Sequence, residues 1–322
     1  MPDEAISRLN QFLSRVDLDS GQTSLWHYDF RFIPVELISG IYESFLSSEK
    51  KEVGAYYTPR NLANFVIDRA FSDSKNILEE IIYDGACGSG ILLTTAYRRM
   101  LSFAEAKLRR PLHFNERRKI LEEHIFGTDL NESACRVTAF SLYLSLLEGL
   151  QPADIGELQD NDNVKLPSLG KRNIIGGAER GDFFSEKNPH ASNHRFTLFL
   201  SNPPWVEPGK NQVLSSDYWA EKHKIKIPRR QTAGAFMLRA RDSLRPNGRM
   251  CLILPVSIMA APTSDKFLKL WLDQFQPETI INFGDLRKLL FSTARNPGMV
   301  ITATPRDKSS IGQRSGIETF EY

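Results

Sequence analysis

The chain has 322 residues, of which 41% are apolar and 25% are charged, and its formal net charge is +2. This length favours about two domains, or one large α/β domain with an extension, and the balanced charge excludes a wholly disordered chain. No apolar run reaches the ~20 residues that span a bilayer, and the N-terminus lacks the basic-then-apolar order of a secretory signal. Three separated cysteines without a CxxC pair exclude a disulfide framework, so we expect a cytoplasmic protein without a membrane span.

The predicted elements begin with helices and continue as an alternation of strands and helices. Apolar residues recur at helical spacing within residues 33–46, and a second helix is expected over residues 61–71. Strands are predicted at 81–84, 125–129, 173–175, 196–200, 250–255, 279–283 and 299–304. Helices are predicted from residue 90 and at 133–150, 233–244 and 264–275. This alternation predicts an α/β fold with a mostly parallel sheet, whose ligands bind beyond the C-terminal ends of the strands.

Two stretches concentrate positive charge although the whole chain is nearly neutral. Residues 97–119 contain eight Lys or Arg side chains against two acidic ones, and residues 219–249 contain nine against two. Such stretches can follow a phosphate backbone, but a solvated helix face has the same composition. Charge alone leaves both interpretations open.

The first two candidate sites follow the first two strands of the alternation. Residues 84–90 (DGACGSG) join a strand to a helix, where glycines allow a tight turn and the helix offers unpaired amide groups. A plain turn and a dinucleotide site both remain open here, although the third glycine of the dinucleotide fingerprint is missing. Asp129 ends the next strand and either holds the ribose hydroxyls of a nucleoside cofactor or caps the following helix, for which Asn131 is a plausible cap.

Two further candidate sites lie at residues 181–184 (GDFF) and 201–205 (SNPPW). Asp182 and Phe183 are suited to holding the amino group and the ring of an adenine, although the same sequence forms a common turn. In the second site, two prolines fix the backbone and remove two N–H donors, so the carbonyl groups remain as acceptors. Asn202 adds an acceptor and Trp205 a ring face for stacking a base, which suits the gripping of an exocyclic amino group. A rigid loop with a buried tryptophan is the alternative interpretation.

In order and type, these motifs resemble those of the gamma-class N6-adenine DNA methyltransferases of restriction–modification and phage-defence systems. The resemblance covers residues 33–304 and includes a GxYYTP element at residues 54–59, which is rarer outside adenine methylases than the other motifs. A helix with the spacing of the family precedes this element and contains Pro34, Glu36, Tyr42 and Glu43. The chain departs from the family at Gly85, where a proline is usual and a looser turn is expected. Asp129 also follows Asp84 at a spacing of 45 residues, which implies an extra basic helical hairpin.

The resemblance implies the Rossmann-like fold of S-adenosylmethionine-dependent methyltransferases. This fold has a seven-stranded, mostly parallel sheet with the last strand antiparallel and helices on both faces. The expected division is an N-terminal helical segment at 1–53, a catalytic domain at 54–305, and a linker or the start of a target-recognition region at 306–322. Because only 18 residues follow Thr304, we expect sequence recognition to reside in a separate domain or a specificity subunit.

The resemblance also implies direct, in-line transfer of a methyl group from S-adenosyl-L-methionine to the amino group of a flipped-out adenine in double-stranded DNA, without a metal. The cofactor-binding residues that it implies are Tyr57, Thr58, Pro59, Asp84, Ala86, Cys87, Gly88, Gly90, Asp129, Leu130, Asp182, Phe183 and Asn202. The catalytic residues that it implies are Asn202, Pro203, Pro204 and Trp205. Two alternatives remain: a methyltransferase for a protein glutamine amide or an RNA guanine amino group, and a non-catalytic, cofactor-binding subunit of a DNA-modification complex.

Overall fold

The structure is a computed structural model that describes residues 58–72, 74–150, 166–260, 264–286, 297–306 and 318–321. These residues belong to one unit that spans Val35–Tyr322. The predictions for the N-terminal helical segment, for Tyr57 and for most of the GxYYTP element lie outside the described residues. Within the described ranges, no helix is long and apolar enough to cross a membrane.

The sheet contains eight strands in the order β3-β2-β1-β4-β5-β7-β6-β8. The strands are β1 (Ile82–Asp84), β2 (Ile125–Asp129), β3 (Ile174–Gly176), β4 (Phe196–Ser201), β5 (Leu244–Pro255), β6 (Phe275–Asn282), β7 (Gly298–Pro305) and β8 (Glu318–Glu321). The seven strands predicted from the sequence are confirmed, and β7 alone among the described strands runs antiparallel to its neighbours, as expected. The strand β8, which pairs with β6 in parallel, was not predicted.

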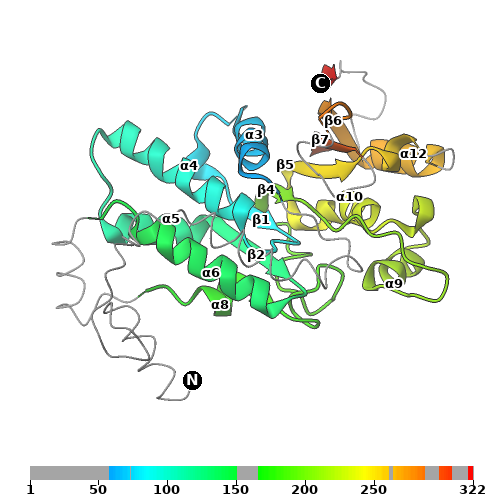
Figure 1. Cartoon of the computed structure of the whole chain (residues 1–322), viewed down its shortest axis with the longest axis horizontal. Coiled ribbons are helices and arrows are strands. Elements are labelled where there is room, and N and C mark those ends of the chain that lie inside the picture. Colours follow the sequence, from blue (N-terminus) through cyan, green and yellow to red (C-terminus); the bar gives the residue numbers. More distant parts are fainter. Residues whose placement is uncertain are drawn as a thin grey trace, which may run out of the picture. The chain divides into compact units, whose positions relative to one another are not determined.

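Helices flank the sheet as its topology requires (Figure 1). The helices are α3 (Arg60–Phe71), α4 (Ile91–Leu108), α5 (Phe114–His124), α6 (Glu132–Leu147), α8 (Leu169–Arg172), α9 (Ser215–Lys222), α10 (Thr232–Ser243), α11 (Ser257–Ala260) and α12 (Asp265–Gln274). The chain winds outward from β1 to β3 in one direction and from β4 to β5 in the other. Because parallel crossovers are right-handed, α4 and α6 cover one face and α10 covers the other. Helix α3 packs against α4, and α12 packs against α10.

Local sequence explains where several of these helices begin. The Asn131 side chain accepts a hydrogen bond from the Ala134 amide at 3.1 Å, which confirms the predicted cap of α6. The backbone amide of His113 donates to the Glu116 carboxylate at 2.9 Å at the start of α5. Helices α4 and α5 form the extra hairpin that the spacing between the first two strands predicted.

The topology places a ligand crevice between β1 and β4. The winding direction reverses at this pair of neighbouring parallel strands, and ligands of open α/β sheets bind beyond the C-terminal strand ends at such a reversal. Below this edge the core is aromatic, with the Tyr83 and Phe196 rings stacked at 4.7 Å between centroids. The core therefore supports the loops that follow β1 and β4 from beneath.

Candidate active site

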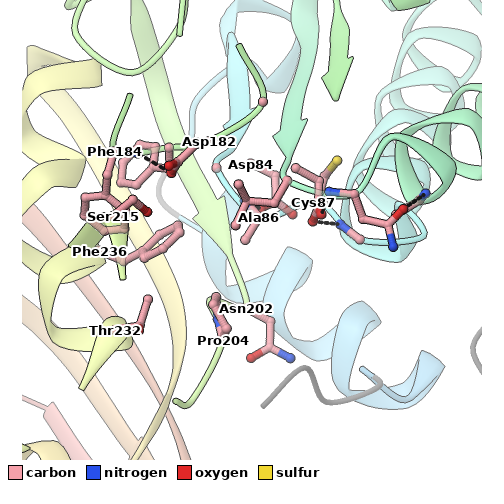
Figure 2. A pocket seen from close by; sticks show the side chains of 18 of the residues that line it. Asp84, Ala86, Cys87, Asp182, Phe184, Asn202, Pro204, Ser215, Thr232 and Phe236 are labelled. Atoms are coloured by element: carbon pink, nitrogen blue, oxygen red, sulfur yellow. Dashed lines mark hydrogen bonds between the residues drawn. The ribbon is translucent and has the colours of Figure 1, made fainter. Parts of the chain in front are cut away.

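A cavity of about 560 Å³ opens at this edge of the sheet. Such a volume falls within the range of small-molecule and cofactor sites. Figure 2 shows Asp182, Phe184, Ser215 and Phe236 on one side of the pocket and Ala86 and Cys87 on the other. The lining residues are Thr58, Asp84, Gly85, Ala86, Cys87, Gly88, Ser89, Ile91, Leu92, Asp129, Leu130, Asn131, Ala134, Ala178, Gly181, Asp182, Phe183, Phe184, Asn202, Pro204, Val206, Val213, Leu214, Ser215, Ser216, Thr232 and Phe236.

Asp84 ties the loop after β1 to the end of β4. Its side chain is buried, and one carboxylate oxygen accepts hydrogen bonds from the Ala86 amide at 3.0 Å and from the Ser201 hydroxyl at 2.6 Å. Burial raises the pKa of Asp84 to about 7, and the two hydrogen bonds oppose this rise because they favour the ionised form. The carboxyl group therefore changes its charge near neutral pH.

The two glycines of the loop have different functions. Gly88 has a φ of +54°, lines the cavity, and has nothing within 4 Å of the position that a Cβ would occupy. Gly90 has a φ of +86°, is not a lining residue, and lies so close to Thr138 of α6 that a Cβ would be 2.6 Å from its methyl group. Gly88 is thus open toward a ligand, whereas Gly90 allows the loop to pack against α6. Of these two expected cofactor-binding residues, only Gly88 lines the cavity.

Asp129 is held in place by the same loop. One of its carboxylate oxygens accepts from the Gly88 amide at 2.9 Å and the other from the Asn131 amide at 2.8 Å. These two backbone contacts orient the Asp129 carboxylate. Asp129 and Leu130 both line the cavity, and Leu130 is 57% exposed there. The cap of α6 is Asn131, so Asp129 does not act as that cap.

An aromatic cluster forms the wall beside Asp182. The Phe183 ring is buried and stacks on Phe236 of α10, with 4.5 Å between ring centroids and 24° between ring planes. The Asp182 carboxylate accepts a hydrogen bond from the Phe184 amide at 2.8 Å. A Cβ at Gly85 would lie 2.8 Å from the Phe183 ring, so this packing explains why a glycine replaces the usual proline of the family. A looser turn was expected at Gly85, and the structure shows Gly85 packed closely against the Phe183 ring.

The loop after β4 brings Asn202 to the cavity. The Asn202 amide nitrogen donates to the Thr58 hydroxyl at 2.9 Å, which directs the opposite end of the amide, its oxygen, away from Thr58. Asn202 and Pro204 line the cavity, whereas Pro203 and Trp205 do not. The Trp205 ring is 7% exposed, and its indole N–H donates to the Ile253 carbonyl at 3.4 Å. A role of Trp205 in stacking a base therefore stays a prediction.

The structure thus brings most of the predicted site residues to one cavity. Those that line it are Thr58, Asp84, Ala86, Cys87, Gly88, Asp129, Leu130, Asp182, Phe183, Asn202 and Pro204. Pro59 instead precedes α3, where its carbonyl accepts from the Ala63 amide. Sequence reasoning missed Phe236 and the wall formed by residues 213–216. Phe184 could have been predicted as a site residue, because it directly follows Asp182 and Phe183.

A sheet in which one antiparallel strand lies beside parallel ones, with a glycine loop after β1, defines the fold of the S-adenosylmethionine-dependent methyltransferases. Residues 35–310 match the family model described as N-6 DNA Methylase. The chain belongs to this family.

Individual relatives are distant in sequence. The type II restriction enzyme and methyltransferase RM.BcgI of Heyndrickxia coagulans is 21% identical over 271 residues, which are 83% of this chain and 34% of that protein. The chain therefore spans about a third of the length of this curated relative.

Two solved structures share the fold. The type IIL restriction–modification enzyme MmeI in complex with DNA superimposes with a TM-score of 0.63 at 16% identity, over 93% of this chain and 42% of that chain. A class I S-adenosylmethionine-dependent methyltransferase, described as putative, from Listeria monocytogenes has a TM-score of 0.54 at 15% identity, over 91% of this chain and 75% of that chain.

Proposed function

We propose that the chain transfers a methyl group from S-adenosyl-L-methionine directly to the exocyclic amino group of an adenine in DNA, as the modification activity of a restriction–modification system. Membership of the N-6 DNA methylase family supports this proposal. The observation that carries it is the orientation of Asn202, whose amide nitrogen is bound to Thr58. The amide oxygen is at the opposite end of a side chain that lines the cavity.

The residues that line the cavity fit the proposed cofactor. When bound, S-adenosylmethionine supplies a methyl group activated by the positive charge on its sulfur. The Asp129 carboxylate, already fixed by two backbone amides, would accept from the ribose hydroxyls. Asp182 would accept from the adenine amino group, and Gly88 leaves room for the ligand to approach the backbone. The aromatic cluster around Phe183 gives this part of the cavity an apolar wall.

The chemistry depends on acceptors aimed at an amino group. The lone pair of the adenine amino nitrogen is delocalised into the ring, which makes this nitrogen a poor nucleophile. The Asn202 side-chain oxygen would accept from one of its N–H groups. The Pro203 carbonyl would accept from the other only after it turns toward the cavity, which Pro203 does not line. Together the two acceptors would favour a tetrahedral nitrogen. Alignment of reacting groups by such contacts can contribute ~7–11 kcal/mol to lowering a barrier. No strong general base is required, because the proton becomes acidic only as the new bond forms.

The target adenine must leave the DNA stack before it reaches the cavity. Extrusion costs a few kcal/mol, and stacking on an aromatic ring offsets ~1–3 kcal/mol per base. Pro204 lines the cavity beside Asn202 and would contact the extruded ring. Trp205 would serve as a stacking surface only after its ring moves from its present contact with Ile253.

The test combines one variant at the site with one matched control. Asn202→Ala should lose at least 100-fold in turnover, the effect typical of removing one preorganised hydrogen-bonding group, while calorimetry still detects cofactor binding. Asn115→Ala, at an exposed position of α5, should leave both quantities unchanged. Turnover of Asn202→Ala within tenfold of the parent would refute the acceptor model.

Labelled-methyl transfer separates the possible substrates. The parent chain is incubated in parallel with genomic DNA, ribosomal RNA and a protein that presents a glutamine side chain. We expect label in N6-methyladenine of the DNA. Label in RNA guanine or in the glutamine amide would refute the proposed substrate, and cofactor binding without any labelled product would identify a non-catalytic subunit.

A further inference from the structure

The two basic stretches of the sequence belong to different elements of the structure. The first belongs to the hairpin of α4 and α5. Helix α4 begins at the cavity and has 18 residues, so at a rise of 1.5 Å per residue its far end lies ~26 Å away. The second stretch begins within residues 207–230, which join the loop after β4 to the start of α10. We call residues 207–230 the rim segment, because four of its residues, 213–216, line the cavity.

Most cations of the hairpin are already neutralised. Arg98 pairs with Glu148 at 2.7 Å, and Arg99 pairs with Asp68 at 2.7 Å. The remaining ion pairs of the hairpin join Arg110 to Glu116, Arg117 to Glu105 and Arg118 to Glu122. These pairs favour the solvated helix face, one of the two interpretations that the sequence left open for this stretch.

The rim segment has six cations and three acidic residues, and its ion pairs are largely internal. Arg229 pairs with Glu207 at 3.4 Å, Arg230 pairs with Asp217 at 2.6 Å, and Lys222 pairs with Glu186 outside the segment. Within the described part of the chain, no carboxylate pairs with Lys210, Lys224 or Lys226, and all three side chains are exposed. The segment thus presents three lysines to solvent, and it borders the cavity at residues 213–216.

Arg230, at the end of the rim segment, is hydrogen-bonded to three residues of its first half. Its guanidinium donates two hydrogen bonds to the Asp217 carboxylate, at 2.9 and 2.6 Å, and others to the Gly209 and Gln212 carbonyls at 3.3 and 2.6 Å. Asp217 in turn accepts from the Leu214 amide at 2.8 Å, at the start of α9. A surface fixed in this way loses little conformational entropy when it binds a partner.

An exposed aromatic side chain completes this surface. Tyr218 lies one turn after Ser215, which lines the cavity, and is 66% exposed. A tyrosine so exposed gains little from folding, but its ring can stack on a base or pack on a sugar. Lysines beside an exposed aromatic ring match the chemistry of a nucleic acid, with its anionic backbone and planar bases.

We propose that the rim segment is the surface by which this chain holds the DNA backbone next to the extruded adenine, with Lys210, Lys224 and Lys226 on phosphates and Tyr218 against a neighbouring nucleotide. This assignment rests on the proposed function, because it takes DNA as the substrate. It assigns no such contact to the hairpin of α4 and α5.

The test measures how DNA binding depends on salt. The full chain is titrated against a fluorescently labelled DNA duplex of random sequence, by anisotropy, from low to moderate salt. Because each neutralised phosphate contributes ~0.9 to the slope of log K against log salt, Lys224→Gln together with Lys226→Gln should reduce the slope by about 1.8. The matched control changes Lys107 and Lys119 of the hairpin to Gln and should leave the slope unchanged.

A second pair of variants tests the aromatic contact. Tyr218→Ala should weaken duplex binding about fivefold or more without changing the salt slope, since it removes a contact without charge. Phe140→Ala removes a similarly exposed ring from α6, at 49% exposure, and should have no effect. The KM for DNA should rise in both rim variants, while the KM for the cofactor stays constant.

Three results would overturn the proposal. They are an unchanged slope in the lysine rim variant, an equal loss in the hairpin control, and no duplex binding by the parent chain at low salt. These outcomes are distinct from a failure of the proposed function, because the slope is measured without methyl transfer. A chain that binds the duplex through the rim segment but never methylates it would refute the activity and leave the surface in place.

Discussion

The two glycines of the loop after β1 provide a paired test of how the site is built. Replacing either by alanine imposes a left-handed backbone on a residue with a Cβ, at a cost of about 1–2 kcal/mol. At Gly90 the new methyl would also lie 2.6 Å from Thr138, and such overpacking adds about 1–3 kcal/mol. We therefore expect Gly90→Ala to lose roughly 2–5 kcal/mol of unfolding free energy and Gly88→Ala roughly 1–2 kcal/mol.

For cofactor affinity, the order of the two variants should be the reverse of their order in loss of stability. A methyl group at Gly88 projects into the cavity, so Gly88→Ala should weaken cofactor binding although it is the more stable of the two. Gly90→Ala should bind the cofactor with nearly parental affinity while it remains folded. Urea unfolding gives the stabilities and titration calorimetry the affinities. Equal destabilisation in the two variants, or a binding defect confined to Gly90→Ala, would refute this division of functions.

Two further predictions concern buried titratable groups. Ser201→Ala removes a hydrogen bond that favours the ionised form of Asp84, so the pKa of Asp84 should rise further above 7, by about one unit. The affinity of Ser201→Ala for the cofactor, whose amine is cationic, should then fall at pH 7 and recover at higher pH. Calorimetry at a series of pH values measures this, and an affinity profile with the same midpoint in the variant and the parent would contradict the prediction. Burial lowers the pKa of His190 to about 4. The unfolded chain therefore binds more protons between pH 4 and 6.5, and His190 should cost up to about 3 kcal/mol of stability as the pH falls through this window. Protonation of Asp84 favours the folded chain in the same pH window, so the effect of His190 is measured as the difference in unfolding free energy between the parent and His190→Asn. If this difference does not depend on pH, the prediction for His190 is wrong.

The parts of the fold that local chemistry dictates could be predicted from the sequence. Continuous apolar runs identified seven strands, and Asn131 marked the start of α6 because its side chain satisfies a helix amide. The strand β6 was expected to start at residue 279 but begins at Phe275, because Pro277 interrupts the pattern and the structure absorbs it with a shift in register. The strand β8 carries no comparable signal and depends on pairing with β6.

The walls of the site that depend on tertiary packing could not be predicted. Residues 213–216 span the start of α9, and Arg230 bonds to Asp217 of this helix, a contact that no local sequence pattern indicates. Phe236 is one apolar residue of a helix, and nothing in its spacing indicates that it faces a cavity. The burial of Phe183 follows from stacking on Phe236, so the sequence could identify the aromatic pair without showing which ring is covered.

The bonds that close the cavity join distant parts of the chain. Ser201 meets Asp84 across 117 positions, and Asn202 meets Thr58 across 144. During synthesis, the acceptor group and its support are therefore united only after β4 has left the ribosome and docked beside β1. A truncated product that ends before Ser201 would carry the glycine loop and Asp129 but lack Asn202, the proposed acceptor. Phe236 of α10 also lines the cavity, so the complete cavity requires a chain that extends beyond β4 as far as α10.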